Sequence, residues 1–122
     1  MKIFVFGSNL AGRHGKGAAL FAKQRHGAVY GQGEGLQGTS YAIPTKDANL
    51  RPLPLKCIAG FVFDFQLFAA GNQSLQFQVT PIGCGLAGYK PADIAPMFFN
   101  SPPNVELPSE FITVLQEIDN AV

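Results

Sequence analysis

An apolar strand followed by a glycine-rich loop and a helix is the feature that most constrains this chain. Residues 5–20 read VFGSNLAGRHGKGAAL, where strand-forming residues give way to small residues, a lone Asn and four glycines. We expect a buried central strand over residues 2–6 and a helix over 15–25. This order predicts an α/β unit whose loop lies at the carboxyl end of the strand, where parallel sheets bind their ligands.

The middle of the chain repeats the alternation of strand and helix. Residues 39–45, TSYAIPT, form a predicted strand that Pro44 ends. Apolar residues at three- and four-residue steps from Ile58 to Ala69 predict an amphipathic helix that Gly71 follows. The segment 31–38, GQGEGLQG, separates the first helix from the second strand. It is too rich in glycine for a regular element, and we expect a mobile flap.

The last third of the chain predicts shorter elements. Apolar and polar residues alternate over 75–80, as in a third strand, and a second glycine turn and a short helix beginning near Pro91 follow. Residues 105–107 fit an edge strand, and Ser109 is the expected N-cap of a final helix. Residues 1–122 are therefore expected to form a single α/β domain with a mostly parallel sheet covered on both faces.

Composition excludes several classes of function. A formal net charge of +1 gives no general attraction to nucleic acid or to an anionic membrane, and no apolar stretch is long enough to span a bilayer. The two cysteines and two histidines lack metal-ligand spacing, so we expect neither a metal site nor a cofactor. Free thiols suit a cytoplasmic location. Nothing in the composition indicates the oligomeric state.

The first glycine loop is a candidate anion site, because glycines let backbone N–H groups approach a ligand and a helix start adds its positive dipole end. It is not a Walker A loop, which needs glycine at Leu10 and Ser or Thr at Gly17. Asn9 either recognises the hydroxyl pair of a sugar or caps its own turn. The candidate ligand-binding residues here are Gly7, Ser8, Asn9, Gly15, Lys16 and Gly17.

The second glycine turn, IGCGLAG, follows the same logic at the end of the third strand. Two such loops facing each other could hold a diphosphate between backbone donors. Tyr89 lies either against a sugar or ring of the ligand or in the core. The candidate binding residues of this turn are Gly83, Cys84, Gly85, Leu86, Ala87, Gly88 and Tyr89.

Lys46 follows Thr45 at the end of the second strand, where the other loops should also emerge. Thr45 is a further candidate binding residue. A lysine there can pair with a phosphate, can act as a nucleophile if burial lowers its pKa, or can be an ordinary exposed side chain.

In their order, the motifs VFGSN, YAIPTKD and VTPIGCGLAGY resemble the macrodomain family, most closely its branch of terminal ADP-ribose protein glycohydrolases. The similarity covers residues 2 to about 99. It implies a three-layer α/β/α sandwich whose cleft holds ADP-ribose, with Asn9 at the distal ribose and residues 83–88 around the diphosphate. Members normally begin with an additional strand and an adenine-reading acidic residue, so the resemblance implies a domain truncated at its N-terminus.

The resemblance also implies a possible reaction. In that branch a lysine attacks the anomeric carbon and an aspartate assists; Lys46 matches the lysine and Asn9 would orient the ribose, while Ala87 occupies the position of the aspartate. Three functions stay open. The leading one is binding of ADP-ribose or a related ribose diphosphate, free or attached to a macromolecule. The others are glycohydrolysis of an ADP-ribosyl bond and a non-catalytic role in protein interaction.

Overall fold

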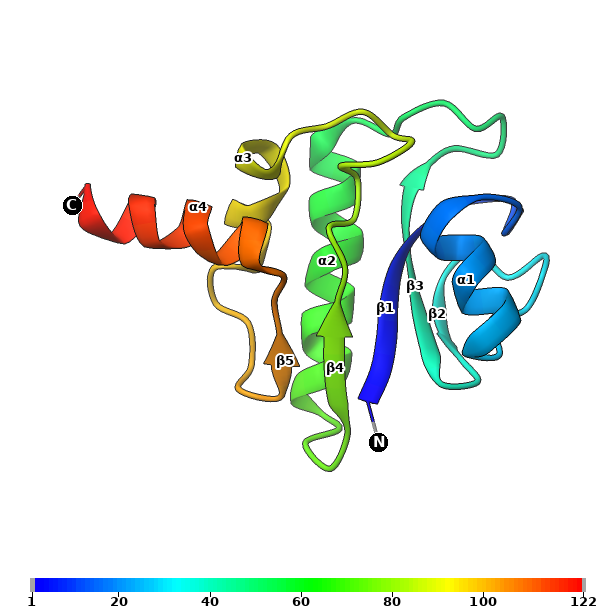
Figure 1. Cartoon of the computed structure of the whole chain (residues 1–122), viewed down its shortest axis with the longest axis horizontal. Coiled ribbons are helices and arrows are strands. Elements are labelled where there is room, and N and C mark those ends of the chain that lie inside the picture. Colours follow the sequence, from blue (N-terminus) through cyan, green and yellow to red (C-terminus); the bar gives the residue numbers. More distant parts are fainter. Residues whose placement is uncertain (1, 122) are drawn as a thin grey trace.

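A five-stranded sheet in the order β2-β3-β1-β4-β5 forms the centre of the protein (Figure 1). The computed structural model describes residues 2–121. The strands are β1 (Lys2–Asn9), β2 (Gly35–Gln37), β3 (Ser40–Lys46), β4 (Gln76–Val79) and β5 (Val105–Glu106). β1 pairs in parallel with both β3 and β4, and β4 pairs in parallel with β5, whereas β2 is antiparallel to β3. The predicted mostly parallel sheet with a central first strand is confirmed.

Helices cover the two faces of this sheet. They are α1 (Gly17–Arg25), α2 (Leu55–Ala70), α3 (Pro91–Ile94) and α4 (Ser109–Asn120), with the 3-10 helix η1 (Ala95–Phe98) directly after α3. α1 lies on one side of the sheet and α2 on the other (Figure 1). α4 packs against α3 and η1 on the side of α2. The result is a three-layer α/β/α arrangement.

The two faces of the sheet have cores of different size. On the α2 side, Phe65 is fully buried and its ring contacts the rings of Tyr41, Phe77 and Phe98 at centroid distances of 5.0, 5.4 and 6.4 Å. On the α1 side the core is small and consists mainly of alanines that pack against Phe6. Small side chains let α1 lie close to β1, and this closeness fixes the position of the loop that joins the two elements.

The prediction of a mobile flap over residues 31–38 is wrong. Part of the segment forms β2, and the Gln37 side chain accepts a hydrogen bond from the Val29 N–H at 2.7 Å and donates one to the Gln32 carbonyl at 3.1 Å. A side chain on Gly33 would overlap the backbone oxygen of Asn9. Glycine therefore serves close backbone packing here, and the segment supports the loop between β1 and α1.

Four predicted boundaries also need correction. β1 continues to Asn9, three residues beyond the predicted end at Phe6, because its parallel pairing with β3 extends that far. Pro44 lies inside β3, not at its end. β2 pairs only with residues 40–42, so at Pro44 the strand has a neighbour on one side only, and the missing N–H of proline is tolerated. Pro108, not Ser109, is the N-cap of α4, and the Ser109 hydroxyl bonds the Glu110 side chain. α1 begins at Gly17, because the preceding residues belong to the loop that β1 leads into.

Candidate functional site

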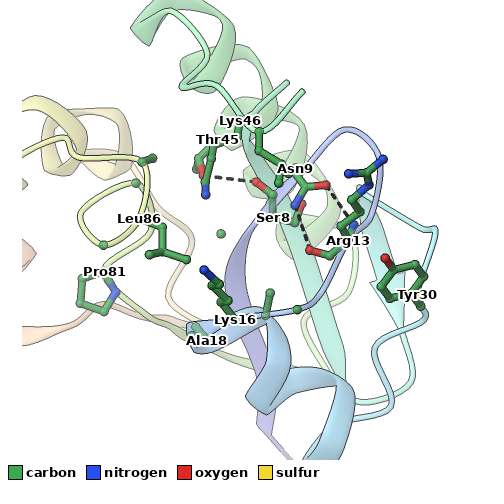
Figure 2. Close-up of a pocket in the computed structure, with 18 residues that line it drawn as sticks. Ser8, Asn9, Arg13, Lys16, Ala18, Tyr30, Thr45, Lys46, Pro81 and Leu86 are labelled. Atoms are coloured by element: carbon green, nitrogen blue, oxygen red, sulfur yellow. Dashed lines mark hydrogen bonds between the residues drawn. The ribbon is translucent and has the colours of Figure 1, made fainter. Parts of the chain in front are cut away.

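A pocket of about 520 Å³ opens at the carboxyl ends of β1 and β3 (Figure 2). This volume lies within the range of roughly 300–1,000 Å³ that is usual for ligand sites. The loop between β1 and α1 forms one wall, and the loop between β4 and α3 forms the opposite wall. The lining residues are Gly7, Ser8, Asn9, Arg13, Gly15, Lys16, Gly17, Ala18, Ala19, Tyr30, Thr45, Lys46, Leu50, Pro81, Gly83, Gly85, Leu86 and Ala87.

Sheet topology explains why a pocket forms at this point. From β1 the chain continues to β3 on one side, and it then crosses to β4 on the other side of β1. The connections after neighbouring strands therefore diverge and leave a crevice above the end of β1. Gly7 lies on its floor, where an added methyl group would be 3.5 Å from the backbone nitrogen of Gly83.

The first turn of α1 presents free backbone donors to this pocket. Gly17, Ala18 and Ala19 form that turn, and their N–H groups have no hydrogen-bond partner among residues 2–121. Lys16 occupies the N-cap position without capping the helix through its side chain. An uncapped helix start with its positive dipole end attracts an anion.

The loop between β4 and α3 presents a second set of free donors. The backbone N–H groups of Gly83, Gly85, Leu86 and Ala87 lack a partner within the described part of the chain. Gly83 and Gly88 have φ values of +74° and +83°, which glycine adopts without strain. Both glycine loops thus offer main-chain N–H groups to the same space.

The charged side chains of the pocket are all cationic. Arg13, Lys16 and Lys46 line it, and no Asp or Glu stands among the lining residues 7–87 that the structure describes. In Figure 2 Lys16 extends into the space between the two loops, while Arg13 lies on the far side from Pro81. Uncompensated positive charge adds to the free N–H groups in favouring an anionic ligand.

The Asn9 side chain closes its own loop. Its Nδ2 donates to the Arg13 carbonyl at 3.0 Å, and its Oδ1 accepts from the Arg13 N–H at 2.9 Å. Asn9 therefore caps its own turn, which is one of the two roles expected for it beside recognition of a sugar. One Nδ2 hydrogen and one Oδ1 lone pair are left over, so the buried Asn9 can still contact a ligand in the pocket.

Two buried hydroxyl groups on the pocket wall are engaged within the protein. The Ser8 hydroxyl donates to the carbonyl of Gly33, and the Thr45 hydroxyl donates to the Ser8 carbonyl at 3.3 Å. The Thr45 bond fixes the end of β3 relative to β1, and the Ser8 bond ties the end of β1 to the 31–38 segment. Ser8 and Thr45 therefore serve as a rigid wall and can offer a ligand only their acceptor lone pairs.

Lys46 lies beside Asn9 in the sheet register and is half-buried. The next residue, Asp47, faces its own turn, where its carboxylate accepts from the N–H groups of Asn49 and Arg51 at 2.8 and 3.0 Å. Asp93, the carboxylate nearest in sequence to the second loop, accepts from the Lys90 N–H at 3.0 Å and does not line the pocket. Within residues 2–121, Lys46 thus has no carboxylate partner in the pocket.

All predicted site residues line the pocket except Cys84, Gly88 and Tyr89. The Tyr89 hydroxyl donates to the Leu53 carbonyl, and its ring packs on the α2-side core. Of the two positions expected for Tyr89, it therefore occupies the one in the core. Burial raises the pKa of the Cys84 thiol, and the carboxylates of Asp93 and Glu110 raise it further. Cys84 is therefore not an activated nucleophile.

Sequence reasoning missed several residues of the pocket. Arg13 and Tyr30 form one end of it, and Pro81 lies at the other (Figure 2). Leu50 reaches the pocket from a turn in which its own φ is +65°. Two signals could have revealed part of this set: Arg13 interrupts a glycine-rich loop, and Tyr30 is an aromatic residue directly before a glycine run.

Residues 2–121 contain no group of three or more His, Cys, Asp or Glu side chains placed to hold a metal ion. Among its helices none combines the length and apolar character needed to cross a membrane. Comparison with protein-family models, with curated proteins and with solved structures gives no match.

Proposed function

We propose that the protein binds ADP-ribose or a related ribose diphosphate in the pocket between its two glycine loops. One observation carries this proposal. Residues with free backbone N–H groups, at the start of α1 and within 83–87, line one pocket whose charged side chains are all basic. Such an arrangement suits a diphosphate, which needs several donors at once and is too large for a single helix start.

The resemblance to macrodomains supports the ribose part of the proposed ligand. In that family the second loop wraps the diphosphate and the first surrounds the distal ribose. Asn9 and Lys46 are polar side chains at the strand ends beside the first loop, and each retains N–H donors for sugar hydroxyls. The ligand would be free or attached to a macromolecule.

We propose binding and not hydrolysis. A lysine nucleophile or a water molecule needs a nearby base for activation, and the lining residues include no carboxylate. Ala87 stands where the related glycohydrolases carry their aspartate. Asp93 is used to cap α3.

The proposed location is the cytoplasm. Cys57 and Cys84 are both free. Free thiols are typical of reducing compartments.

A thermal-denaturation series tests the proposed function. Binding to the folded state raises the melting temperature by mass action, so ADP-ribose should raise it progressively through the millimolar range. Ribose without phosphate should have no effect, because it lacks the charge that the pocket selects. An unchanged melting temperature at millimolar ADP-ribose would contradict the proposal.

A further inference from the structure

Tyr30 is an exposed aromatic side chain at one end of the pocket. Its exposed fraction is 58%, although it lines the cavity. The Lys23 Nζ lies 5.3 Å from the centroid of its ring, and the ring of buried His14 meets it nearly edge-on, at 6.5 Å between centroids and 75° between planes. The remaining surface of the ring faces solvent and the pocket.

The backbone around Tyr30 is fixed. The Val29 N–H donates to the Gln37 side chain at 2.7 Å, the Gln32 N–H donates to the Val29 carbonyl at 3.0 Å, and the Gly31 N–H donates to the Gly12 carbonyl at 2.8 Å. These bonds tie the turn to β2 and to the first glycine loop. A rigidly held, exposed aromatic ring beside a pocket is preorganised to stack on a planar ring of a ligand.

The order of groups along the pocket indicates which part of the ligand reaches Tyr30. The N–H groups proposed to bind phosphate lie at the start of α1 and in the loop between β4 and α3. Asn9 comes next along the pocket, and Tyr30 lies beyond it with Arg13 (Figure 2). A diphosphate at the first position and a ribose beside Asn9 would direct the group on C1 of that ribose toward Tyr30.

The charges near Tyr30 select the kind of ring. Lys23 lies over the ring, and the Arg13 guanidinium has no hydrogen-bond or ion-pair partner within residues 2–121. A cationic ring would be repelled there. A neutral heterocycle with acceptor atoms would stack on Tyr30 and accept hydrogen bonds from Arg13.

We propose that the ligand is an ADP-ribose whose distal ribose carries a neutral planar heterocycle, which stacks on Tyr30. This inference rests on the proposed function and names the class of ligand more narrowly: a dinucleoside diphosphate. Base–aromatic stacking contributes about 5-fold or more to affinity.

Calorimetric titration of the full chain tests this with four ligands. Diadenosine diphosphate and NADH carry a neutral ring on the distal ribose, NAD carries a cationic ring, and ADP-ribose carries none. Diadenosine diphosphate and NADH should bind about 5-fold or more tightly than ADP-ribose, and NADH more tightly than NAD. Tyr30→Ala should abolish the advantage of the ring-bearing ligands, and Tyr30→Trp should retain it.

Phe63→Ala is the matched control, since Phe63 has the same exposed fraction of 58% but lies on α2 outside the pocket. It should leave all four affinities unchanged. Equal affinities of all four ligands for the wild type, or a ring advantage that survives Tyr30→Ala, would overturn the role of Tyr30 while leaving ADP-ribose binding intact. No binding of any ligand to the wild type would instead remove the proposed function and the inference together.

Discussion

A methyl group added to Gly17 would lie 3.9 Å from the Cδ1 atom of Leu86. The first residue of α1 and the tip of the β4–α3 loop therefore face each other at contact distance. The two walls of the pocket come from segments almost 70 residues apart in sequence. Their approach brings two sets of free backbone N–H groups to one space.

Gly17→Ala should destabilise the protein by about 1 kcal/mol. The φ of Gly17 is +58°, a conformation that costs an L-residue about 1–2 kcal/mol. Gly15→Ala is the control, because Gly15 has no positive φ and open space around its Cα. Urea denaturation measures both. Equal stability of the two variants would show that the turn into α1 does not require glycine.

Lys16→Ala should weaken ADP-ribose binding about 5-fold and reduce its salt dependence, because an exposed cation beside the phosphates is lost. Lys56→Ala removes an exposed lysine on α2 that does not line the pocket. Affinities at low and high salt provide the comparison. If both variants lost the same affinity, the effect would come from net charge and not from the site.

Two glycine substitutions should change stability in opposite directions. Gly60→Ala lies on the exposed face of α2 with nothing within 4 Å and should stabilise by about 0.5–1 kcal/mol, since alanine loses less backbone entropy. Gly33→Ala should cost about 1–3 kcal/mol, because its methyl group would overlap the Asn9 carbonyl. Thermal denaturation reports both. A neutral Gly33→Ala would mean that the 31–38 segment is not packed against the first loop.

Stability should fall between about pH 10 and pH 12 through Tyr41. The pKa of Tyr41 is raised to about 12, mainly by burial and to a lesser extent by the carboxylates of Glu34 and Asp64. The unfolded chain, with a tyrosine pKa near 10, ionises first, so the free energy of unfolding drops by about 2 kcal/mol across this window. The Tyr41→Phe variant should not show this decrease in the free energy of unfolding. Identical pH profiles of urea midpoints for both proteins would exclude it.

Long periodic or apolar segments allowed most of the fold to be predicted. β1 and α2 have side-chain patterns that match one kind of element, and Gly71 does end the long helix as expected. β2 could not be predicted, because its pairing with β3 depends on the Gln37 hydrogen bonds and on contacts with a loop that is distant in sequence. The composition GQGEGLQG indicated mobility, but here its glycines allow close packing.

The candidate site was predictable where backbone chemistry defines it and not where side chains do. Glycines at strand ends marked both loops, and the topology brought them together. Tyr89 was ambiguous, because an aromatic residue at a loop end can face a ligand or the core. In the structure its hydroxyl donates to the Leu53 carbonyl and the side chain lies in the core. Arg13 and Tyr30 carry no motif, and their meeting at one end of the pocket depends on the turn that the Gln37 side chain supports.

The central claim is that main-chain N–H groups of the two loops hold the diphosphate. A ¹H–¹⁵N NMR titration of the 122-residue chain with ADP-ribose observes these groups individually. The largest shifts should fall on the amides of Gly17, Ala18, Ala19, Gly83, Gly85, Leu86 and Ala87. Unchanged resonances at these positions, or shifts confined to the exposed face of α2 around Phe63, would contradict it.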